Sequence, residues 1–414
     1  MKPKSASAKK STQKRRFKPK HKRINRTLEF SIDSMDSMGQ GVSKIDNKPC
    51  FVAKTLPGEK GKATELKASK GVMFAKLDTL DVTADNREEP RCRHFNNCPG
   101  CHYLHTDYLS ELGYKRQALQ YHLKQLEKSF PEIELPDIEM SPAQERLGYR
   151  NRVQLHYRHK YIGMMDGLTN QVVEIPECLA IEPVLKEVFD QLYQDKSWVT
   201  EHEEQGHCEL YSTDEGVSIE WNQPYAHGGF SQVNTCMNSA LRASVVRQAR
   251  NGGAKVETLL DLFSGEGNLS DDLVSDTAVA GGENSQVKRV MVDYAPDRVA
   301  QEELNFVHLD LFSESALRTF KARSKYQHFD LLLVDPPRKG FPDLALWVNA
   351  YKPKKLIYVS CNAATMIRDL QQLLSRQKLS GQQSTKKCSI DHIELIDLFP
   401  STYHYETLVT VSFK

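Results

Sequence analysis

One cysteine of this chain lies where it could act on a substrate. Cys361 ends the apolar segment Tyr358-Val-Ser-Cys361-Asn, and an earlier apolar run ends in Asp335-Pro-Pro-Arg338. In an α/β transferase such strand ends face the substrate, and a cysteine thiolate there could form a temporary bond to carbon. A basic, partly exposed site would lower the thiol pKa from roughly 8.5, and Arg338 is a candidate for that charge. The alternative is that Cys361 is a small buried hydrophobic residue without a catalytic role, which is the commoner role of a free cysteine.

A second group of cysteines has the spacing of metal ligands. Three thiolates lie around a Pro-Gly turn, at Cys92, Cys98 and Cys101. A fourth ligand must come from elsewhere, and Cys178 is the best candidate. Four thiolates are typical of an iron–sulfur cluster, whereas zinc would also accept His94 or His102 as its fourth ligand. Unrelated buried thiols are the remaining alternative.

A glycine-rich turn and a series of acidic strand ends indicate a nucleotide-like cofactor. The run from Leu259 to Leu269 is an apolar strand followed by Gly265-Glu-Gly267, and later apolar runs end at Asp293, Asp310 and Asp335. Such a series suits S-adenosylmethionine, whose ribose hydroxyls bind an acid at the end of the second strand. Glu283 is the alternative to Asp293 for that contact. A dehydrogenase would show a fuller Gly-x-Gly-x-x-Gly motif.

The segments that must position these residues fall into four parts. Residues 1–26 carry twelve Lys or Arg and no acid, against 44 basic and 54 acidic residues in the remainder. We expect this basic tail to be disordered and to bind RNA by counterion release, although a merely solubilising arm would look the same. Residues 27–88 show about five short strands with tight turns, which predicts an OB-like barrel that binds nucleic acid or supports a larger domain.

The rest of the chain predicts two further parts. Residues 89–236 are expected to form a β-rich central domain around the cysteine cluster, with an amphipathic helix from Leu109 to Phe130. Residues 237–414 alternate strands and helices, which predicts an α/β domain with a Rossmann-like sheet.

Composition limits where the protein works. No apolar run approaches the roughly 18 residues that span a bilayer, and no apolar segment follows the N-terminal charges as in a signal peptide. We therefore expect a cytoplasmic protein without a membrane partner, whose nine cysteines are thiols or ligands rather than disulfides. No obligate protein partner is evident.

Together these motifs resemble the RNA (uracil-5-)-methyltransferases, and most closely the bacterial 23S rRNA enzymes of the RumA/RlmD type. The resemblance covers nearly everything after the tail. The matching segments are Leu56-Pro-Gly-Glu59, Tyr149-Arg-Asn-Arg152, Phe230-Ser-Gln232-Val-Asn234, Asp261-Leu-Phe263-Ser-Gly-Glu-Gly-Asn268, Asp335-Pro-Pro-Arg338-Lys-Gly340, Ser360-Cys361-Asn362 and Thr402-Tyr-His404-Tyr-Glu406-Thr. It implies a class I adenosylmethionine-dependent methyltransferase domain, a barrel of the TRAM type, and a [4Fe-4S] cluster on Cys92, Cys98, Cys101 and Cys178.

The resemblance also implies roles for single residues. Cys361 matches the nucleophile, Glu406 the proton-abstracting base, and Phe230 a residue near the target base. The positions that match adenosylmethionine contacts are Gln232, Phe263, Asn268, Asp310 and Asp335. The chain departs from the family where Ala363 stands in place of a proline, and between Ser275 and Leu304, where its reshaped sequence puts the ribose contact in doubt.

The implied reaction is methylation of uracil C5, a carbon that is too weakly nucleophilic to react unaided. Cys361 would add to C6, C5 would then accept the methyl group, and Glu406 would remove the C5 proton. Because C6 is reached only in an unstacked base, the substrate should be a loop or single-stranded RNA, with Phe230 and Arg338 as candidate RNA contacts.

Several alternatives stay open at this point. The family subtype indicates 23S rRNA, and a uridine of the tRNA T-loop is the alternative substrate. A catalytically silent RNA-binding factor of ribosome assembly would be expected to lack Cys361 or Glu406, and both are present. An amino-group methyltransferase would share Asp-Pro-Pro but would need no cysteine.

Overall fold

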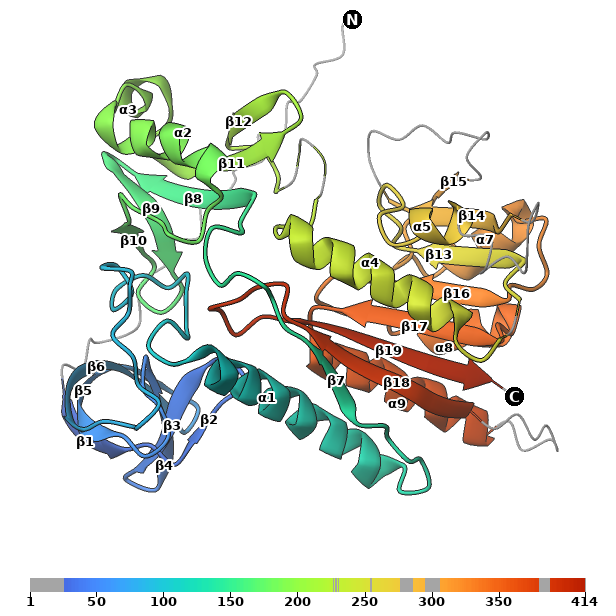
Figure 1. Cartoon of the computed structure of the whole chain (residues 1–414), viewed down its shortest axis with the longest axis horizontal. Coiled ribbons are helices and arrows are strands. Elements are labelled where there is room, and N and C mark those ends of the chain that lie inside the picture. The colour runs from blue at the N-terminus through green and yellow to red at the C-terminus, as the bar shows by residue number, and fades with distance from the viewer. Residues whose placement is uncertain are drawn as a thin grey trace, which may run out of the picture.

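The computed structural model describes residues 26–225, 227, 229, 231–253, 255–275, 286–294, 306–379 and 388–413. Three separate β-sheets organise these residues, and Figure 1 shows them mainly as the blue, the green and the yellow-to-red parts of the ribbon. The predicted basic tail lies outside the described residues, apart from Arg26.

The first sheet is a curled six-stranded sheet near the N-terminus (Figure 1). Its strand order is β1-β5-β6-β4-β3-β2, and β1 also contacts β3, so the sheet bends back on itself. Its strands are β1 (Thr27–Ser31), β2 (Ser34–Met35), β3 (Gln40–Ile45), β4 (Lys48–Ala53), β5 (Lys60–Ser69) and β6 (Val72–Val82). All five strands expected in this segment are present, and β2 is an additional short one. Leu28, Phe30, Val52 and Met73 fill the interior.

The second sheet lies in the central part of the chain and has the order β10-β9-β8-β11-β12. Its elements are β8 (Arg152–Arg158), β9 (Tyr161–Asp166), β10 (Gln171–Glu174), β11 (Gln205–Thr213), β12 (Gly216–Trp221), α2 (Pro183–Gln194) and α3 (Trp198–Glu201). Phe189 of α2 and Trp198 of α3 are buried against Leu155, Tyr157 and Leu210 of the sheet. The short strands expected in this part of the chain are therefore present.

The third sheet has eight strands in the order β15-β14-β13-β16-β17-β19-β18-β7. The first five run parallel, whereas β19 is antiparallel to both β17 and β18, and β7 is parallel to β18. The strands are β7 (Ile138–Ser141), β13 (Thr258–Leu262), β14 (Lys288–Asp293), β15 (Phe306–His308), β16 (Leu331–Val334), β17 (Lys355–Ser360), β18 (Cys388–Ile396) and β19 (Glu406–Phe413). This confirms the predicted Rossmann-like α/β architecture.

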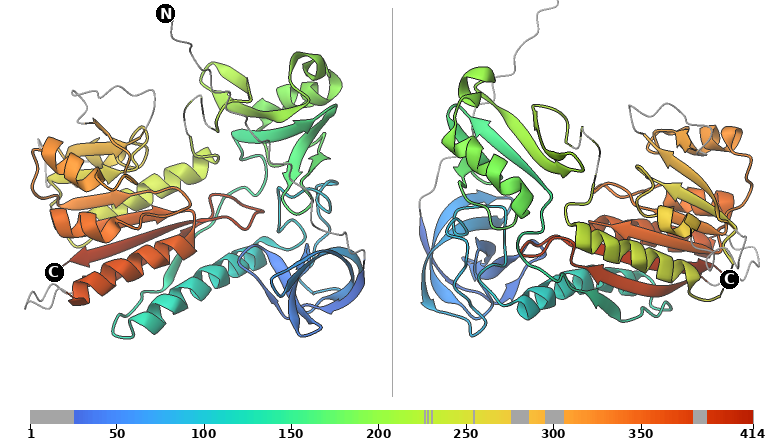
Figure 2. Two further views of the ribbon diagram at one scale, coloured as in Figure 1. Left: turned by 180° about the vertical axis from the view of Figure 1, so that it is seen from behind. Right: turned by 45° about the horizontal axis from the view of Figure 1, so that its top comes forward.

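Both faces of the third sheet are buried, because successive strand residues point to opposite sides. Leu260, Leu332 and Leu356 belong to one core, whereas Leu259, Leu331 and Ile357 belong to the other. Helices cover each face, as the two further views in Figure 2 show. The helices of this part are α1 (Tyr108–Ser129), α4 (Thr235–Arg250), α5 (Asp271–Ser275), α7 (Ala316–Arg323), α8 (Leu344–Tyr351) and α9 (Ala363–Leu379).

The third sheet extends beyond residues 237–414. Strand β7 forms its edge, and α1 lies against α9 on one face, although both elements come from residues 89–236 (Figure 1). The apolar stripe of α1 is core, as expected, since Leu119, Leu123 and Leu126 join the large cluster of this sheet. The chain therefore passes from the first sheet to the third, then to the second, and back to the third.

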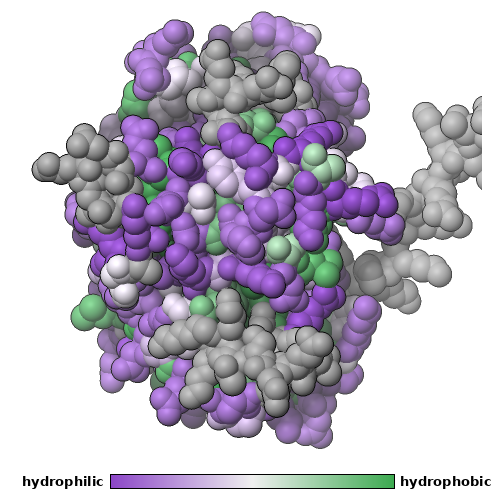
Figure 3. Space-filling model, turned by 90° about the vertical axis from the view of Figure 1, so that its right-hand side faces the viewer, coloured by the Kyte–Doolittle hydropathy of each residue, from purple (hydrophilic) through white to green (hydrophobic). Residues whose placement is uncertain are grey.

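The end of the molecule that carries the third sheet is mainly hydrophilic on the face seen in Figure 3, with apolar residues scattered among polar ones. Among the described residues, the structure has no helix long and apolar enough to cross a membrane.

Candidate active site

The candidate site lies at the carboxyl edge of the third sheet. Strand order reverses at β13, because β14 and β15 lie on one side of it and β16 and β17 on the other. Such a switch point opens a crevice beyond the strand ends. Asp293 ends β14, while Asp310 and Asp335 follow β15 and β16 closely, so three predicted acids meet at this edge.

The pairing of two strands brings Cys361 and Glu406 together. β17 ends at Ser360 and β19 begins at Glu406, and Ser360 pairs with Thr407 in antiparallel register. The next opposed residues along this register are Cys361 and Glu406. Asp335 follows the neighbouring parallel strand β16, and both carboxyl groups act electrostatically on the Cys361 thiol. A thiol and two carboxyl groups at the ends of three neighbouring strands therefore share one site.

The surroundings of Cys361 are the reverse of the basic site expected from the sequence. Burial, followed by the charges of Glu406 and Asp335, raises the pKa of its thiol to about 12, and Arg338 acts in the opposite direction. Burial also raises the pKa of Asp335 to about 7 and holds the pKa of Glu406 well above its usual value. The expectation of a lowered thiol pKa is therefore wrong, because an enclosed site with two carboxyl groups disfavours another negative charge.

Arg338 is the cation of this site. Its side chain is exposed, and its charge acts on Cys361, Glu406 and His404. Its backbone carbonyl accepts a hydrogen bond of 2.9 Å from Nδ2 of Asn362, the residue that follows Cys361. This contact ties the Asp-Pro-Pro-Arg segment to the end of β17. An exposed arginine beside the thiol is suited to an anionic group of a substrate.

The turn after β13 has the backbone of a ligand-binding loop. Phe263, Gly265 and Gly267 all have positive φ, of 61°, 50° and 93°. For phenylalanine this conformation is strained, and such strain clusters at functional sites. The backbone N–H of Gly265 donates to Oδ2 of Asp293 at 2.6 Å. The turn and the acid at the end of β14 are therefore fixed as one unit.

The other candidate cofactor residues lie around this turn. Asn268 exchanges side-chain amide hydrogen bonds of 2.9 Å with Asn238 of α4. Asp310 accepts a 2.9 Å hydrogen bond from the backbone N–H of Phe312, and the Phe312 ring lies 5.4 Å from that of Phe263. Aromatic rings and carboxylates at one crevice suit a cofactor that carries an adenine and a ribose.

The segment that carries Gln232 is held by the central sheet. Asn151 Nδ2 donates to the carbonyl of Gln232 at 2.9 Å, and the Asn151 N–H donates to the carbonyl of Val233 at 3.0 Å. Arg152 donates to the carbonyl of Gly229 at 2.7 Å. These two residues of the Tyr-Arg-Asn-Arg motif thereby connect the second sheet to the crevice of the third. The predicted Phe230, and Glu283 as the alternative ribose acid, lie outside the described residues.

The four cysteines predicted to bind a metal line one pocket. Cys92, Cys98, Cys101 and Cys178 surround it, together with apolar side chains. Over the described part of the chain, however, no three or more His, Cys, Asp or Glu side chains stand close enough together to hold a metal ion. The residue types suit a thiolate-bound centre, and the structure brings them to one place without drawing the sulfur atoms into ligand positions.

Two cations border this pocket. Lys54 Nζ donates to the carbonyls of Cys98 and Cys101 and lies 4.0 Å from the centre of the Phe95 ring. Arg150 is close to the carbonyl of Gly100, at 3.4 Å. No carboxylate of the described residues forms an ion pair with either cation. A centre with several thiolates is negatively charged, so these cations fit it electrostatically.

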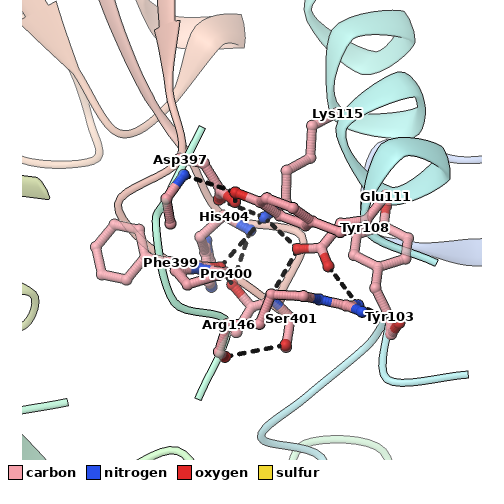
Figure 4. Close-up of polar contacts among 12 residues, drawn as sticks. Tyr103, Tyr108, Glu111, Lys115, Arg146, Asp397, Phe399, Pro400, Ser401 and His404 are labelled. Atoms are coloured by element: carbon pink, nitrogen blue, oxygen red, sulfur yellow. Dashed lines mark hydrogen bonds and ion pairs between the residues drawn. The ribbon is translucent and has the colours of Figure 1, made fainter. Parts of the chain in front are cut away.

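Sequence reasoning missed a buried charge cluster next to the site. It consists of Glu111 and Lys115 of α1 with Arg146 and Asp397, and we call it the Lys115 cluster (Figure 4). A signal existed in the sequence. Glu111 and Lys115 continue the buried stripe of α1 at helical spacing, so two charged side chains occupy positions of an apolar face.

Comparisons with known proteins agree with this geometry. The family described as "tRNA (Uracil-5-)-methyltransferase" matches residues 215–414. A protein of Shewanella frigidimarina named 23S rRNA (uracil(1939)-C(5))-methyltransferase RlmD is 26% identical, with 94% of this chain and 96% of that protein covered. An uncharacterized RNA methyltransferase of Bdellovibrio bacteriovorus is also 26% identical, with 92% of this chain and 94% of that protein covered.

A solved structure has the same fold. It is the Pyrococcus abyssi tRNA (uracil-54, C5)-methyltransferase in complex with S-adenosyl-L-homocysteine. Its TM-score is 0.66 at 19% identity, and the match covers 92% of this chain and 99% of that one. The third sheet therefore has the class I adenosylmethionine-dependent methyltransferase fold.

Proposed function

We propose that this chain, whose residues 215–414 match the tRNA (Uracil-5-)-methyltransferase family, methylates C5 of a uridine in 23S rRNA through a covalent bond between Cys361 and uracil C6. It is an adenosylmethionine-dependent enzyme that acts on RNA. The observation that carries the proposal is the opposed register of Cys361 and Glu406 at the ends of β17 and β19.

The proposed mechanism uses these two residues in sequence. The Cys361 thiol gives its proton to an acceptor of the bound substrate or to water, and its sulfur adds to C6, which makes C5 nucleophilic. Bound adenosylmethionine would supply the electrophilic methyl group that C5 takes up, and its sulfur would leave with the bonding electron pair as adenosylhomocysteine. Glu406 then removes the C5 proton, the C5–H electron pair restores the C5–C6 double bond, and the C6–S bond breaks to release the Cys361 thiolate.

Burial of the site has a direct bearing on this chemistry. The raised pKa of Cys361 means that the free thiol is a weak nucleophile at neutral pH. The thiol can act as soon as a bound substrate places a proton acceptor or a positive charge beside it. The raised pKa of Glu406 likewise makes its carboxylate a stronger base than an exposed glutamate, once it has lost its proton.

The cofactor residues of the proposal are Gln232, Phe263, Asn268, Asp293, Asp310 and Asp335. Gly265 leaves open space beside the turn, where an added Cβ would meet no atom within 4 Å, so a ligand can approach the backbone there. Asp335, next to Cys361, is suited to the positive sulfur of adenosylmethionine. Arg338, and Phe230 outside the described residues, are the proposed RNA contacts.

We further propose a [4Fe-4S] cluster on Cys92, Cys98, Cys101 and Cys178, within a central domain of residues 89–236. The shared pocket and the cations Lys54 and Arg150 support this cluster. Measuring the iron and zinc content of the purified protein tests it. The curled first sheet, in residues 27–88, is proposed to be an OB-like barrel of the TRAM type that binds RNA backbone together with the basic tail, residues 1–26. Such an enzyme would act in the cytoplasm.

A uridine of tRNA is the second candidate substrate. It is favoured by the name of the matched family and by the fold shared with the Pyrococcus abyssi tRNA enzyme. The relative named as a 23S rRNA enzyme in Shewanella frigidimarina matches a similar share of the chain at a higher identity, 26% against 19% for the tRNA enzyme, and this favours 23S rRNA.

A trapping assay tests the proposal. Fluorine at C5 cannot leave as a proton, so 5-fluorouridine-substituted RNA should stall as a denaturation-resistant adduct on the wild type and not on Cys361→Ala. The same assay with 23S rRNA fragments and with tRNA identifies the substrate. Methyl transfer without any adduct would contradict the role of Cys361 and favour an amino-group methyltransferase, whereas RNA binding without either would favour an assembly factor.

A further inference from the structure

The proposed base, Glu406, lies at the end of a loop that is fixed unusually firmly. Residues 397–405 connect β18 to β19, and we call this segment the β18–β19 loop. Figures 1 and 2 show it projecting from the third sheet toward α1 and the cysteine segment. Glu406 is the first residue after it, and its Oε2 is buried with no hydrogen-bond partner in the described structure. No hydrogen bond of this oxygen fixes the carboxyl group, so the backbone that carries Glu406 contributes to its position.

The Lys115 cluster holds the start of this loop. The Lys115 ammonium donates to Glu111 Oε1 at 2.8 Å, to Asp397 Oδ1 at 2.6 Å and to the carbonyl of Phe399 at 3.2 Å. The side chains of Glu111, Lys115 and Asp397 are fully buried. Tyr108 OH donates to the second oxygen of Asp397 at 2.7 Å. Figure 4 shows Lys115 between the two carboxylates, one from α1 and one from the loop.

In the middle of the loop, both the N–H and the carbonyl of Ser401 form hydrogen bonds. Its N–H donates to Glu111 Oε1 at 2.6 Å, and its carbonyl accepts from the N–H groups of His102 and Tyr103 at 2.7 and 3.1 Å. Ser401 is fully buried with φ of 65°, a conformation that costs a non-glycine residue on the order of 1 kcal/mol or more. Tyr149 OH donates to the carbonyl of the adjacent Pro400 at 2.9 Å.

These contacts are poorly explained by stability alone. A buried ion-pair cluster is often no more stabilising than apolar side chains of similar volume, and the strained Ser401 adds a cost. The strained Ser401 lies in the loop that leads to Glu406, and the ion-pair cluster holds this loop through Asp397. Misplacing a reacting group by about 1 Å can slow a reaction on the order of a hundredfold, so the base needs a rigid support.

We propose that Glu111, Lys115, Arg146 and Asp397 are positioning residues for proton abstraction, which act by fixing the β18–β19 loop and thereby the carboxyl group of Glu406. The inference rests on the proposed function, because it assumes that Glu406 is the base. His102 and Tyr103 follow Cys101 directly, so the cysteine segment is part of the same support. Loosening the loop should slow removal of the C5 proton and leave the earlier addition to C6 and methyl transfer intact.

The test separates these steps in a single turnover on ordinary RNA. Methyl transfer is followed with labelled adenosylmethionine, proton removal by release of tritium from C5 of the uridine, and the adduct on a denaturing gel. Glu111→Gln keeps the size of the side chain and removes the charge that holds Lys115 and Arg146. We expect methyl transfer within about twofold of wild type, tritium release at least about tenfold slower, and accumulation of a methylated protein–RNA adduct.

A second variant guards against a simple loss of folding. Ser401→Gly relieves the positive φ, which offsets the loss of the 3.3 Å hydrogen bond from Ser401 Oγ to the Arg146 carbonyl, and it gives the turn more freedom. We expect it to slow tritium release as well, by a smaller factor. The matched control is Asp190→Asn, which removes the acid of an exposed i,i+4 pair with Lys186 on α2 and should leave every step unchanged. Leu192→Ala in the second sheet's core is the control for general destabilisation.

Glu406→Gln distinguishes failure of this inference from failure of the proposed function. If Glu406→Gln accumulates the methylated adduct and Glu111→Gln and Ser401→Gly release it at the wild-type rate, the positioning role is refuted and the proposed function stands. If all steps of Glu111→Gln slow equally, as in Leu192→Ala, the cluster is only structural. If Glu406→Gln methylates and releases RNA normally, Glu406 is not the base, and the positioning inference is refuted together with that step of the mechanism. The proposed methylation through Cys361 is then still decided by the trapping assay with Cys361→Ala.

Discussion

The raised pKa of Asp335 predicts a pH-dependent affinity for the cofactor. Burial and the neighbouring Asp261 and Asp293 raise this pKa to about 7. Adenosylmethionine carries a positively charged sulfur, which should bind beside a charged Asp335 and not beside a neutral one. Its affinity should therefore increase as the pH rises through 7.

The magnitude follows from the protonation equilibrium. With a pKa of about 7, roughly one Asp335 carboxyl group in ten is charged at pH 6 and nine in ten at pH 8, so the dissociation constant should be about tenfold higher at pH 6, a difference of about 1.4 kcal/mol. Below pH 6 the affinity should fall by a further factor of about ten for each pH unit until the pKa of the bound form is reached.

Isothermal titration calorimetry at several pH values measures this effect. Adenosylhomocysteine is the matched control ligand, because its sulfur is neutral and its affinity should vary much less with pH. Asp335→Asn should bind adenosylmethionine weakly and without this pH dependence. Asp261→Asn should retain a pH dependence, with its midpoint moved to lower pH because the charge of Asp261 helps to raise the pKa of Asp335. This separates Asp335 from a neighbour whose own pKa is also raised to about 7. Equal pH profiles for the two ligands, or an unchanged profile in Asp335→Asn, would refute the reasoning.

Three further predictions concern stability, the metal site and the cofactor segment. Burial raises the pKa of Asp261 to about 7, so the folded state keeps the proton up to that pH and the free energy of unfolding of the wild type falls as the pH rises toward 7. In urea unfolding, the free energy of unfolding of Asp261→Asn should therefore rise by about 3 kcal/mol relative to that of the wild type between pH 5 and pH 9. A difference between the two proteins that stays constant with pH would contradict this. Lys54→Met should lower the metal content of the purified protein, whereas Lys160→Met on the surface should not. Equal metal contents of the two variants would argue against a role of Lys54 in balancing the charge of the thiolates. Asn151→Ala should raise the dissociation constant of adenosylmethionine several-fold, because the carbonyl of Gln232 loses its hydrogen bond; an unchanged constant would show that this segment does not bind the cofactor.

The local structure of this protein could be predicted from the sequence. The strands of the first sheet, the helix over residues 108–129 and the glycine turn after Leu262 all follow from side-chain periodicity and turn residues. These signals act over a few neighbouring residues, so they survive without knowledge of the rest of the chain. The candidate residues were found in the same way, together with a resemblance of motifs.

Only the tertiary structure decided how these parts meet. The pairing of β17 with β19 puts Glu406 opposite Cys361, and burial beside Glu406 and Asp335 reverses the expected direction of the Cys361 pKa. The contribution of α1 and β7 to the third sheet, and the support of the β18–β19 loop by Lys115, are further results of packing. Strand partners and the polarity around a charge depend on residues far apart in the chain, such as Ser360 with Thr407 and Lys115 with Asp397, and for that reason residue types and spacing alone could not fix them.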